Sequence, residues 1–169
     1  EPPALERSRA ELPADVALFL GDFNAEAFER AEQIVISPGV SMQEPAIAAA
    51  FARGIPVIGD IELFAQAAVA PVIAVTGSNG KSTVVTLLGA MARRAGLDVR
   101  VGGNIGTPAL DLITEQEPDL YVLELSSFQL ETVSSLRPQA AAVLNVSADH
   151  MDRYTDLQAY AATKQSIFR

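Results

Sequence analysis

The chain has 169 residues, and 49% of them are hydrophobic, which is enough to bury a core. Twelve basic against 21 acidic residues give a net charge of −9, which disfavours nucleic acid and anionic membranes as partners. The absence of cysteine excludes disulfides and thiolate metal sites and fits a cytoplasmic location, and no apolar run approaches the length of a membrane span.

The first part of the chain alternates short apolar runs with helical patterns, which is typical of βαβ units. The expected strands are at residues 16–20, 34–37 and 56–58, and the expected helices are at 25–31 and 45–53. Gly54 is placed to end the second helix, and acidic residues in the first turn favour another helix from Asp60. Residues 66–71 are then interpreted as a boundary.

A second α/β unit is expected from residue 72 onwards. Its expected strands are at residues 72–76, 98–101, 120–125 and 140–146, and its expected helices are at 82–95 and 156–169, with a short helix after Pro108. Together these elements predict two α/β units with mostly parallel sheets. Since ligands of such sheets bind at the carboxyl ends of the strands, residues that follow a predicted strand are the candidates for a site.

The most informative motif connects the strand at 72–76 to the helix after it, and it reads Gly77-Ser78-Asn79-Gly80-Lys81-Ser82-Thr83. Glycine-rich turns of this kind let backbone N–H groups close on phosphate oxygens that face a helix N-terminus. Lys81 would then reach the terminal phosphates of a nucleotide, and Ser82 would ligate magnesium. The two glycines are closer together than in the standard phosphate-binding loop, so a plain turn between strand and helix is the alternative.

Three further residues are candidates for chemistry. Glu124 ends an apolar strand, where a carboxylate is costly to bury unless it is paired, and a metal is preferred over a salt bridge. His150, the only histidine, follows the last strand between Asp149 and Asp152. A lone histidine is more often structural than a ligand, and both acids could be caps or turn formers. By pattern alone, Lys164 is an ordinary surface lysine.

Taken together, these motifs resemble the Mur ligases of peptidoglycan synthesis. The matching segments are the glycine-rich loop at 77–83, Gly-Asn-Ile-Gly at 103–106, Glu-Leu-Ser-Ser-Phe-Gln-Leu-Glu at 124–131 and the run at 145–154, together with 37–39 and 59–64. Within the family, the Leu-Ser-Ser-Phe-Gln run after Glu124 is similar to the member that adds D-glutamate. The resemblance covers nearly the whole chain.

The resemblance implies an ATP-dependent amide-bond ligase with a monomeric, cytoplasmic chain. ATP phosphorylates the carboxylate of UDP-N-acetylmuramoyl-L-alanine, and the amine of D-glutamate attacks the acyl phosphate. It assigns Lys81 to the β- and γ-phosphates of ATP, and Ser82 with Glu124 to one magnesium. A second magnesium is assigned to Glu124 and His150, and Lys164 matches a family lysine that is carbamylated and would complete that second site. The residues implied on the UDP-sugar side are Ser37, Gly39, Asn104 and Ser126.

The resemblance also implies how the chain is divided. Residues 1–70 are expected to be part of a Rossmann-like N-terminal domain for the UDP substrate, and residues 71–169 part of a P-loop-type central ATP-binding domain. Both are expected to be incomplete, with the C-terminal domain absent, so the chain is predicted to be an inactive fragment. The alternatives are another Mur-type ligase, a P-loop ATPase or phosphotransferase that turns over ATP without D-glutamate, and a noncatalytic binding fragment.

Overall fold

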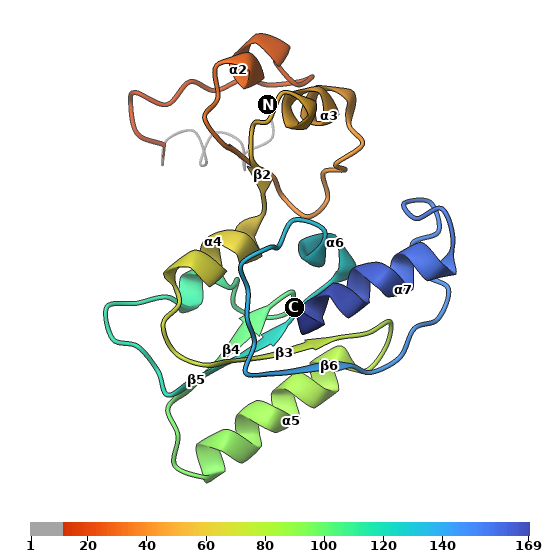
Figure 1. Ribbon diagram of the computed structural model, residues 1–169. Helices are drawn as coiled ribbons and strands as arrows, with labels where there is room; N and C mark the ends of the chain where they lie inside the picture. Colours follow the sequence, from red (N-terminus) through yellow and green to blue (C-terminus); the bar gives the residue numbers. More distant parts are fainter. Residues whose placement is uncertain (1–11) are drawn as a thin grey trace.

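The computed structural model of the chain describes residues 12–169. Figure 1 shows an upper unit with a two-stranded sheet and a lower unit with a four-stranded sheet, and every strand pair in both sheets is parallel. The predicted α/β class with parallel sheets is therefore confirmed. In the described part of the chain, no helix is both long and apolar enough to cross a membrane.

The upper unit consists of α2 (Ala25–Glu29), β1 (Ile34–Val35), α3 (Pro45–Ala52) and β2 (Val57–Ile58). The side chain of Asn24 caps α2 by accepting a hydrogen bond from the N–H of Ala27. Gly54, with φ of +87°, follows the C-cap of α3 and lets the chain turn back towards β2. The small core of this unit consists of Ile34, Ile36, Ile47, Ala50 and Val57.

The predicted strand at residues 16–20 is wrong. These residues have no regular secondary structure, and Val16, Leu18, Phe19 and Leu20 are 42% to 57% exposed. A strand needs a neighbour that pairs with its backbone N–H and C=O groups, and β1 and β2 pair with each other alone among residues 12–169. Residues 17–19 instead line a cavity of about 430 Å³ that also reaches Ser37 and Ile47.

The lower unit has the strand order β4-β5-β3-β6. In chain order its elements are β3 (Val72–Thr76), α5 (Lys81–Arg94), β4 (Val99–Gly103), the 3-10 turn η1 (Leu110–Leu112), β5 (Leu120–Glu124), α6 (Ser127–Leu130), β6 (Ala140–Val143), α7 (Leu157–Gln165) and the 3-10 turn η2 (Ser166–Phe168). Helix α5 covers one face of the sheet, while α4, α6 and α7 cover the other (Figure 1).

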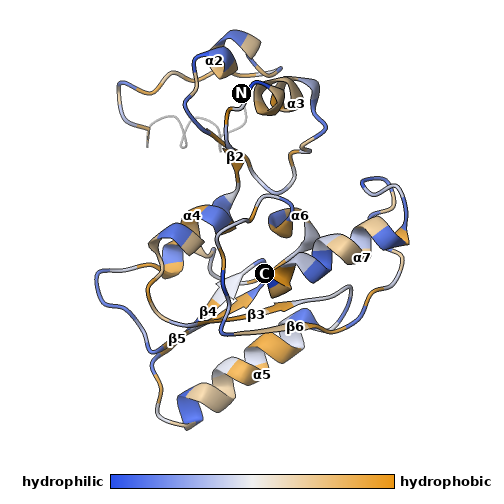
Figure 2. Cartoon of the chain, viewed as in Figure 1, coloured by the Kyte–Doolittle hydropathy of each residue, from blue (hydrophilic) through white to orange (hydrophobic). Residues whose placement is uncertain are grey.

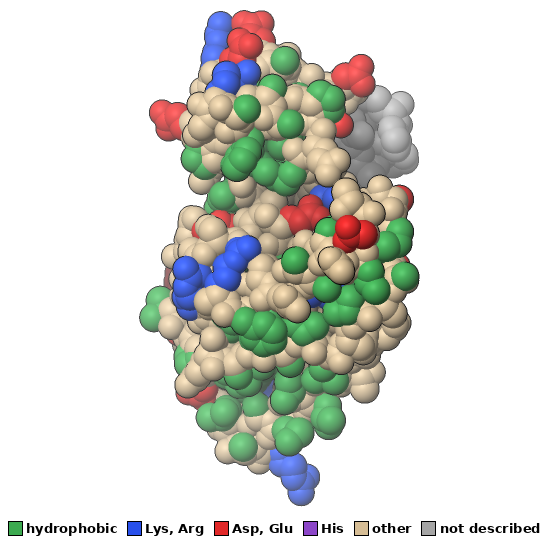
Figure 3. All heavy atoms as spheres, turned by 45° about the vertical axis from the view of Figure 1, so that its right-hand side comes forward, with side chains coloured by type: hydrophobic (Ala, Val, Ile, Leu, Met, Phe, Trp, Pro, Cys, Tyr) green, Lys and Arg blue, Asp and Glu red, His purple; other side chains and the backbone are tan. Residues whose placement is uncertain are grey.

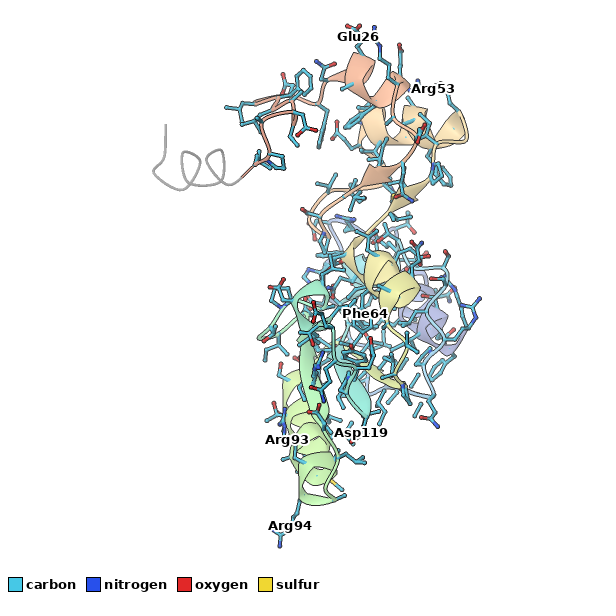
Figure 4. All side chains as sticks on the ribbon, turned by 90° about the vertical axis from the view of Figure 1, so that its left-hand side faces the viewer. Glu26, Arg53, Phe64, Arg93, Arg94 and Asp119 are labelled. Carbon is cyan, nitrogen blue, oxygen red and sulfur yellow. The ribbon has the colours of Figure 1, made fainter. Side chains whose placement is uncertain are left out.

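The central strands of the lower sheet are the hydrophobic part of this unit, whereas the outer surface of the helices is mixed (Figure 2). The strand predicted at 72–76 coincides with β3. The helix expected after Pro108 is only η1, and the last helix stops at Gln165 and continues as η2. Arg94 ends α5 and points into solvent at the far end of the unit (Figure 4).

Helix α4 (Asp60–Ala67) joins the two units and packs on the lower sheet. The ring of Phe64 meets Tyr121 edge to face at a centroid distance of 5.0 Å, beneath the helix in Figure 4. The helix extends to Ala67 and so overlaps the segment at 66–71 that was interpreted as a boundary. Ile61 and Phe64 are fully buried in the core of the lower unit, so α4 packs as part of that unit. The division of the chain at residue 70 stays a prediction.

Candidate active site

The candidate residues of the lower unit lie at the carboxyl edge of its sheet. The loops that follow β3, β5 and β6 begin at Gly77, Leu125 and Leu144, and the loop after β4 begins at Asn104. Because parallel strands bring their carboxyl ends to one edge, these four loops come together although they are far apart in the sequence.

The glycine-rich loop leads directly into α5. Gly77 and Gly80 have φ of +152° and +83°, which side chains other than glycine rarely adopt, and a Cβ at Gly77 would lie 3.2 Å from the Cβ of Leu144. The Nζ of Lys81 donates to the carbonyl of Gly77 at 3.0 Å and to that of Ser78 at 3.2 Å. The carbonyls of the loop therefore surround the ammonium group of Lys81 at the N-terminus of α5, a helix of 14 residues.

Asn145 holds the loop in this shape. Its carbonyl accepts from the N–H of Ser78 at 3.0 Å, its side-chain oxygen accepts from the N–H of Asn79, and its amide donates back to the carbonyl of Asn79, both at 2.9 Å. Next to it, the hydroxyl of Ser78 accepts from the N–H of Ser147 at 3.0 Å. Asn145 lies inside the strand predicted at 140–146, whereas β6 ends at Val143, so sequence reasoning assigned it no role. Its place in the matching run at 145–154 was the available signal.

Glu124 has a buried carboxylate, 2% exposed, that accepts two hydrogen bonds from neutral groups. The hydroxyl of Ser82 donates to Oε2, and the amide of Asn104 donates to Oε1, each at 2.7 Å. The N–H of Asn104 also donates to the carbonyl of Glu124 at 2.8 Å, an approach that requires glycine at position 103, where φ is +102°. No described lysine or arginine pairs with Glu124, so the structure lends no support to the salt-bridge alternative.

Lys164 is 1% exposed, so the interpretation as a surface lysine is wrong. Its Nζ donates to the carbonyl of Gly77 at 3.1 Å and lies 4.4 Å from the ring centroid of Tyr160. Burial, and secondarily the charge of Lys81, lower the pKa of Lys164 to about 8, while Asp149 acts in the opposite direction. Burial therefore shifts the amine of Lys164 towards its neutral form.

His150 lies in the loop that follows β6. Its backbone has φ of +54°, its side chain is 45% exposed, and its Nε2 lies 3.6 Å from Oδ2 of Asp149. Its ring packs against Phe128 at a centroid distance of 4.7 Å and lies 6.5 Å from that of Tyr160. Within residues 12–169, His150 forms no hydrogen bond or ion pair with Glu124, and no three His, Asp or Glu residues cluster as a metal site.

The residues expected on the UDP-sugar side fall into two groups. Ser37 and Gly39 follow β1 in the upper unit, and Ser37 lines the cavity of about 430 Å³ there. Ser126 lies in the lower unit and caps α6, since its hydroxyl accepts from the N–H of Gln129 at 3.2 Å. Asn104 flanks Glu124, as described above. The structure thus distributes this set over both units, and its assignment to a substrate stays a prediction.

Comparison with known proteins identifies the family of this chain. The family model described as the Mur ligase middle domain matches residues 75–169, which is more than half of the chain. The chain belongs to the Mur ligase family. A second model, described as the Mur ligase MurD-like N-terminal domain, matches residues 1–59. Mur ligases are enzymes that in general use ATP and Mg²⁺.

Similar proteins were found among curated sequences and solved structures. The chain is 62% identical over its whole length to a UDP-N-acetylmuramoylalanine–D-glutamate ligase of Marinobacter nauticus, and 61% identical over 99% of its length to the ligase of that name from Nitrosococcus oceani. It spans 37% of the length of each. A crystal structure of UDP-N-acetylmuramate:L-alanyl-gamma-D-glutamyl-meso-diaminopimelate ligase from Neisseria meningitides shares the fold, with a TM-score of 0.57 and 20% identity over 99% of this chain and 56% of that one.

Proposed function

We propose that this chain is part of an ATP-dependent ligase that joins D-glutamate to UDP-N-acetylmuramoyl-L-alanine through an acyl phosphate, in the synthesis of peptidoglycan precursors. The names of the relatives at 61% and 62% identity support the choice of substrates. The observation that carries the proposal is the buried carboxylate of Glu124, bonded to Ser82 directly beyond the glycine-rich loop. A buried carboxylate there that pairs with no lysine or arginine among residues 12–169 favours a divalent cation beside a nucleotide.

The residues at this edge fit ATP and Mg²⁺. The N–H groups at the start of α5 and the ammonium of Lys81 are donors for phosphate oxygens, and glycines at 77 and 80 leave room for a close approach. Ser82 and Glu124 supply the oxygen ligands that magnesium prefers. ATP supplies the phosphoryl group that activates a carboxylate, and magnesium neutralises the anions that have to meet.

Each side chain then has a definite task. Lys81 exchanges the carbonyls of Gly77 and Ser78 for the β- and γ-phosphates, a change that needs only rotation of a flexible side chain. Asn104 keeps one oxygen of Glu124 occupied, which orients the other towards Ser82 and the metal. The remaining loop residues, Ser78, Asn79 and Thr83, are proposed to belong to the same phosphate site.

Lys164 is proposed to carry a carbamate. The neutral amine bonds through nitrogen to the carbon of CO₂ and loses a proton, which leaves a carboxylate at the end of a long side chain. The lowered pKa of Lys164, about 8, supports the neutral amine that this step requires. Together with Glu124 and His150, this carboxylate would ligate a second magnesium. His150 is partly exposed, so it can turn towards that site from its place beside Phe128.

The two units are proposed to divide the substrates between them. Residues 1–70 would bind the UDP end, with Ser37 and Gly39 in the upper unit and with Asn104 and Ser126 facing it from the lower unit. Residues 71–169 would bind ATP. We further propose that the protein is a cytoplasmic monomer and that this 169-residue chain alone has little activity, because a partly built site loses preorganisation.

Phosphate release tests the proposal. The full-length gene product is assayed with magnesium, ATP, UDP-N-acetylmuramoyl-L-alanine and D-glutamate, and each is omitted in turn; the 169-residue chain is assayed in parallel. Release that requires both acceptor substrates is the expected result. Release without D-glutamate would instead indicate a P-loop ATPase or phosphotransferase, and release with a different amino acid would indicate another Mur-type ligase.

A further inference from the structure

Arg153, in the loop between β6 and α7, reaches across to the upper unit. Its guanidinium donates to the carbonyl of Gly39 at 3.3 Å and to that of Val40 at 3.1 Å. These partners are 114 and 113 residues away in the sequence. In the part of the chain that the structure describes, every side-chain hydrogen bond between residues 37–40 and the lower unit comes from this one arginine.

The guanidinium is itself held on two sides by the lower unit. Oε2 of Glu131 accepts from it at 2.6 Å, and both side chains of this pair are mostly buried, at 14% and 17% exposed. Its carbon Cζ lies 4.6 Å from the ring centroid of Phe128. The other oxygen of Glu131 accepts from the hydroxyl of Tyr154 at 2.6 Å. Arg153 is therefore a rigid fork that presents two donors to the upper loop.

The same contacts connect the upper loop to His150. Arg153 follows His150 by three residues, its N–H donates to the carbonyl of His150 at 2.9 Å, and both side chains pack on the ring of Phe128. The space-filling view shows a constriction between the two units, with charged side chains on the surface there (Figure 3). The hydrogen bonds of Arg153 connect the two units across it. A shift of residues 37–40 would thus be transmitted through Arg153 to the loop that carries His150.

We propose that Arg153 is a positioning residue that fixes the Ser37–Val40 loop against the His150 loop, and so sets where the sugar-nucleotide end of the substrate lies relative to the reacting carboxylate. The part about substrate rests on the proposed function. The part about the loop does not, because it depends only on the contacts of the guanidinium with Gly39, Val40 and Glu131.

Hydrogen–deuterium exchange tests the loop contact without any assay of activity. In the full-length gene product, Arg153→Ala is expected to speed exchange in peptides covering residues 37–44 by about ten-fold, since about two hydrogen bonds to the loop are lost. Arg30→Ala is the matched control, because Arg30 pairs with Glu26 at 3.1 Å on the surface with both side chains more than 70% exposed. Unchanged exchange in Arg153→Ala overturns the proposal.

Steady-state kinetics test the consequence for substrate. Arg153→Ala is expected to raise KM for UDP-N-acetylmuramoyl-L-alanine about ten-fold while KM for ATP changes less than about two-fold. Arg153→Lys is expected to be intermediate, because an ammonium keeps the charge but cannot match the fork of donors. A merely structural role would lower the amount of active enzyme and leave both KM values unchanged, and that result would also overturn the proposal.

The outcomes separate the two proposals. If the unsubstituted protein releases no phosphate in a D-glutamate-dependent way, the proposed function fails, while the exchange experiment still decides the role of Arg153. If Arg153→Ala does not fold, Glu131→Gln replaces it, since that change removes the charge that holds the guanidinium and keeps the shape of the side chain. Glu131→Gln is expected to speed exchange in residues 37–44, and wild-type exchange in this folded variant counts against the proposal.

Discussion

Glu62 in α4 allows a quantitative test of how much its hydrogen bonds to the lower unit contribute to the free energy of unfolding. Its carboxylate is 3% exposed, yet Oε2 accepts from the N–H groups of Ser134 and Ser135 at 2.7 and 2.9 Å, and Oε1 accepts from the amide of Gln66 at 3.0 Å. Burial by itself raises the pKa of Glu62, but these donors outweigh it and lower the pKa from 4.5 to about 2. Glu62→Gln removes the charge and keeps the shape.

The size and sign of the effect follow from linkage. The difference between 4.5 and about 2 corresponds to roughly 3 kcal/mol in the free energy of unfolding at neutral pH. Because the pKa is lower in the folded state, this contribution is complete above about pH 4.5 and is lost as the pH falls towards 2. Glu62→Gln should therefore be less stable by about 2 to 3 kcal/mol at pH 7, and the gap to wild type should close below pH 4.5.

Urea unfolding monitored by circular dichroism at several pH values measures this gap. Glu115→Gln is the control, because Glu115 is exposed and its replacement should change stability by less than about 0.5 kcal/mol at every pH. A gap between wild type and Glu62→Gln that stays constant from pH 7 to pH 3 would refute the reasoning, since it would show that packing rather than charge carries the contribution.

Three other predictions concern the site and its glycines. Lys164→Ala in the full-length protein should abolish turnover, and added short carboxylates should partly restore it in a phosphate-release assay; full activity in the plain variant would contradict the carbamate. Glu124→Gln should lower kcat about 100-fold or more in the same assay, and a rate near wild type would exclude Glu124 as a metal ligand. Gly103→Ala should cost several kcal/mol in urea unfolding, roughly 3 more than Gly96→Ala, because both have positive φ but only the Cβ at 103 would collide with the carbonyl of Glu124; equal losses would contradict this.

Much of the fold could be predicted from short-range signals. Apolar runs predicted β1 to β6 to within a few residues, because buried parallel strands are continuous hydrophobic segments. Gly54 was predicted to end α3, and in the structure it follows the C-cap of that helix with a positive φ. Asp156 caps α7 by accepting from the N–H of Ala159, so the start of the last helix was also predicted to within one residue.

The site was predicted in part, and its roles are still predictions. The glycine-rich loop and the segment at His150 follow strands and Glu124 ends one, and a parallel sheet brings such residues to one edge whatever their distance in the sequence. Their motifs identified the Mur ligase family, which the family models confirm. The functions assigned to individual residues await the experiments above.

By itself, the sequence determined most of the segments that form helices and strands, and the edge of the sheet at which the candidate residues collect, because these depend on hydrophobic pattern, turn residues and the direction of parallel strands. Only the tertiary structure decided what depends on packing between distant segments. It left residues 16–20 without a strand partner among residues 12–169, and it buried Lys164 against Gly77 and Tyr160. It also placed Arg153 where its guanidinium donates hydrogen bonds to the carbonyls of Gly39 and Val40. Burial and long-range hydrogen bonds belong to pairs of segments, and no local pattern in either partner specifies them.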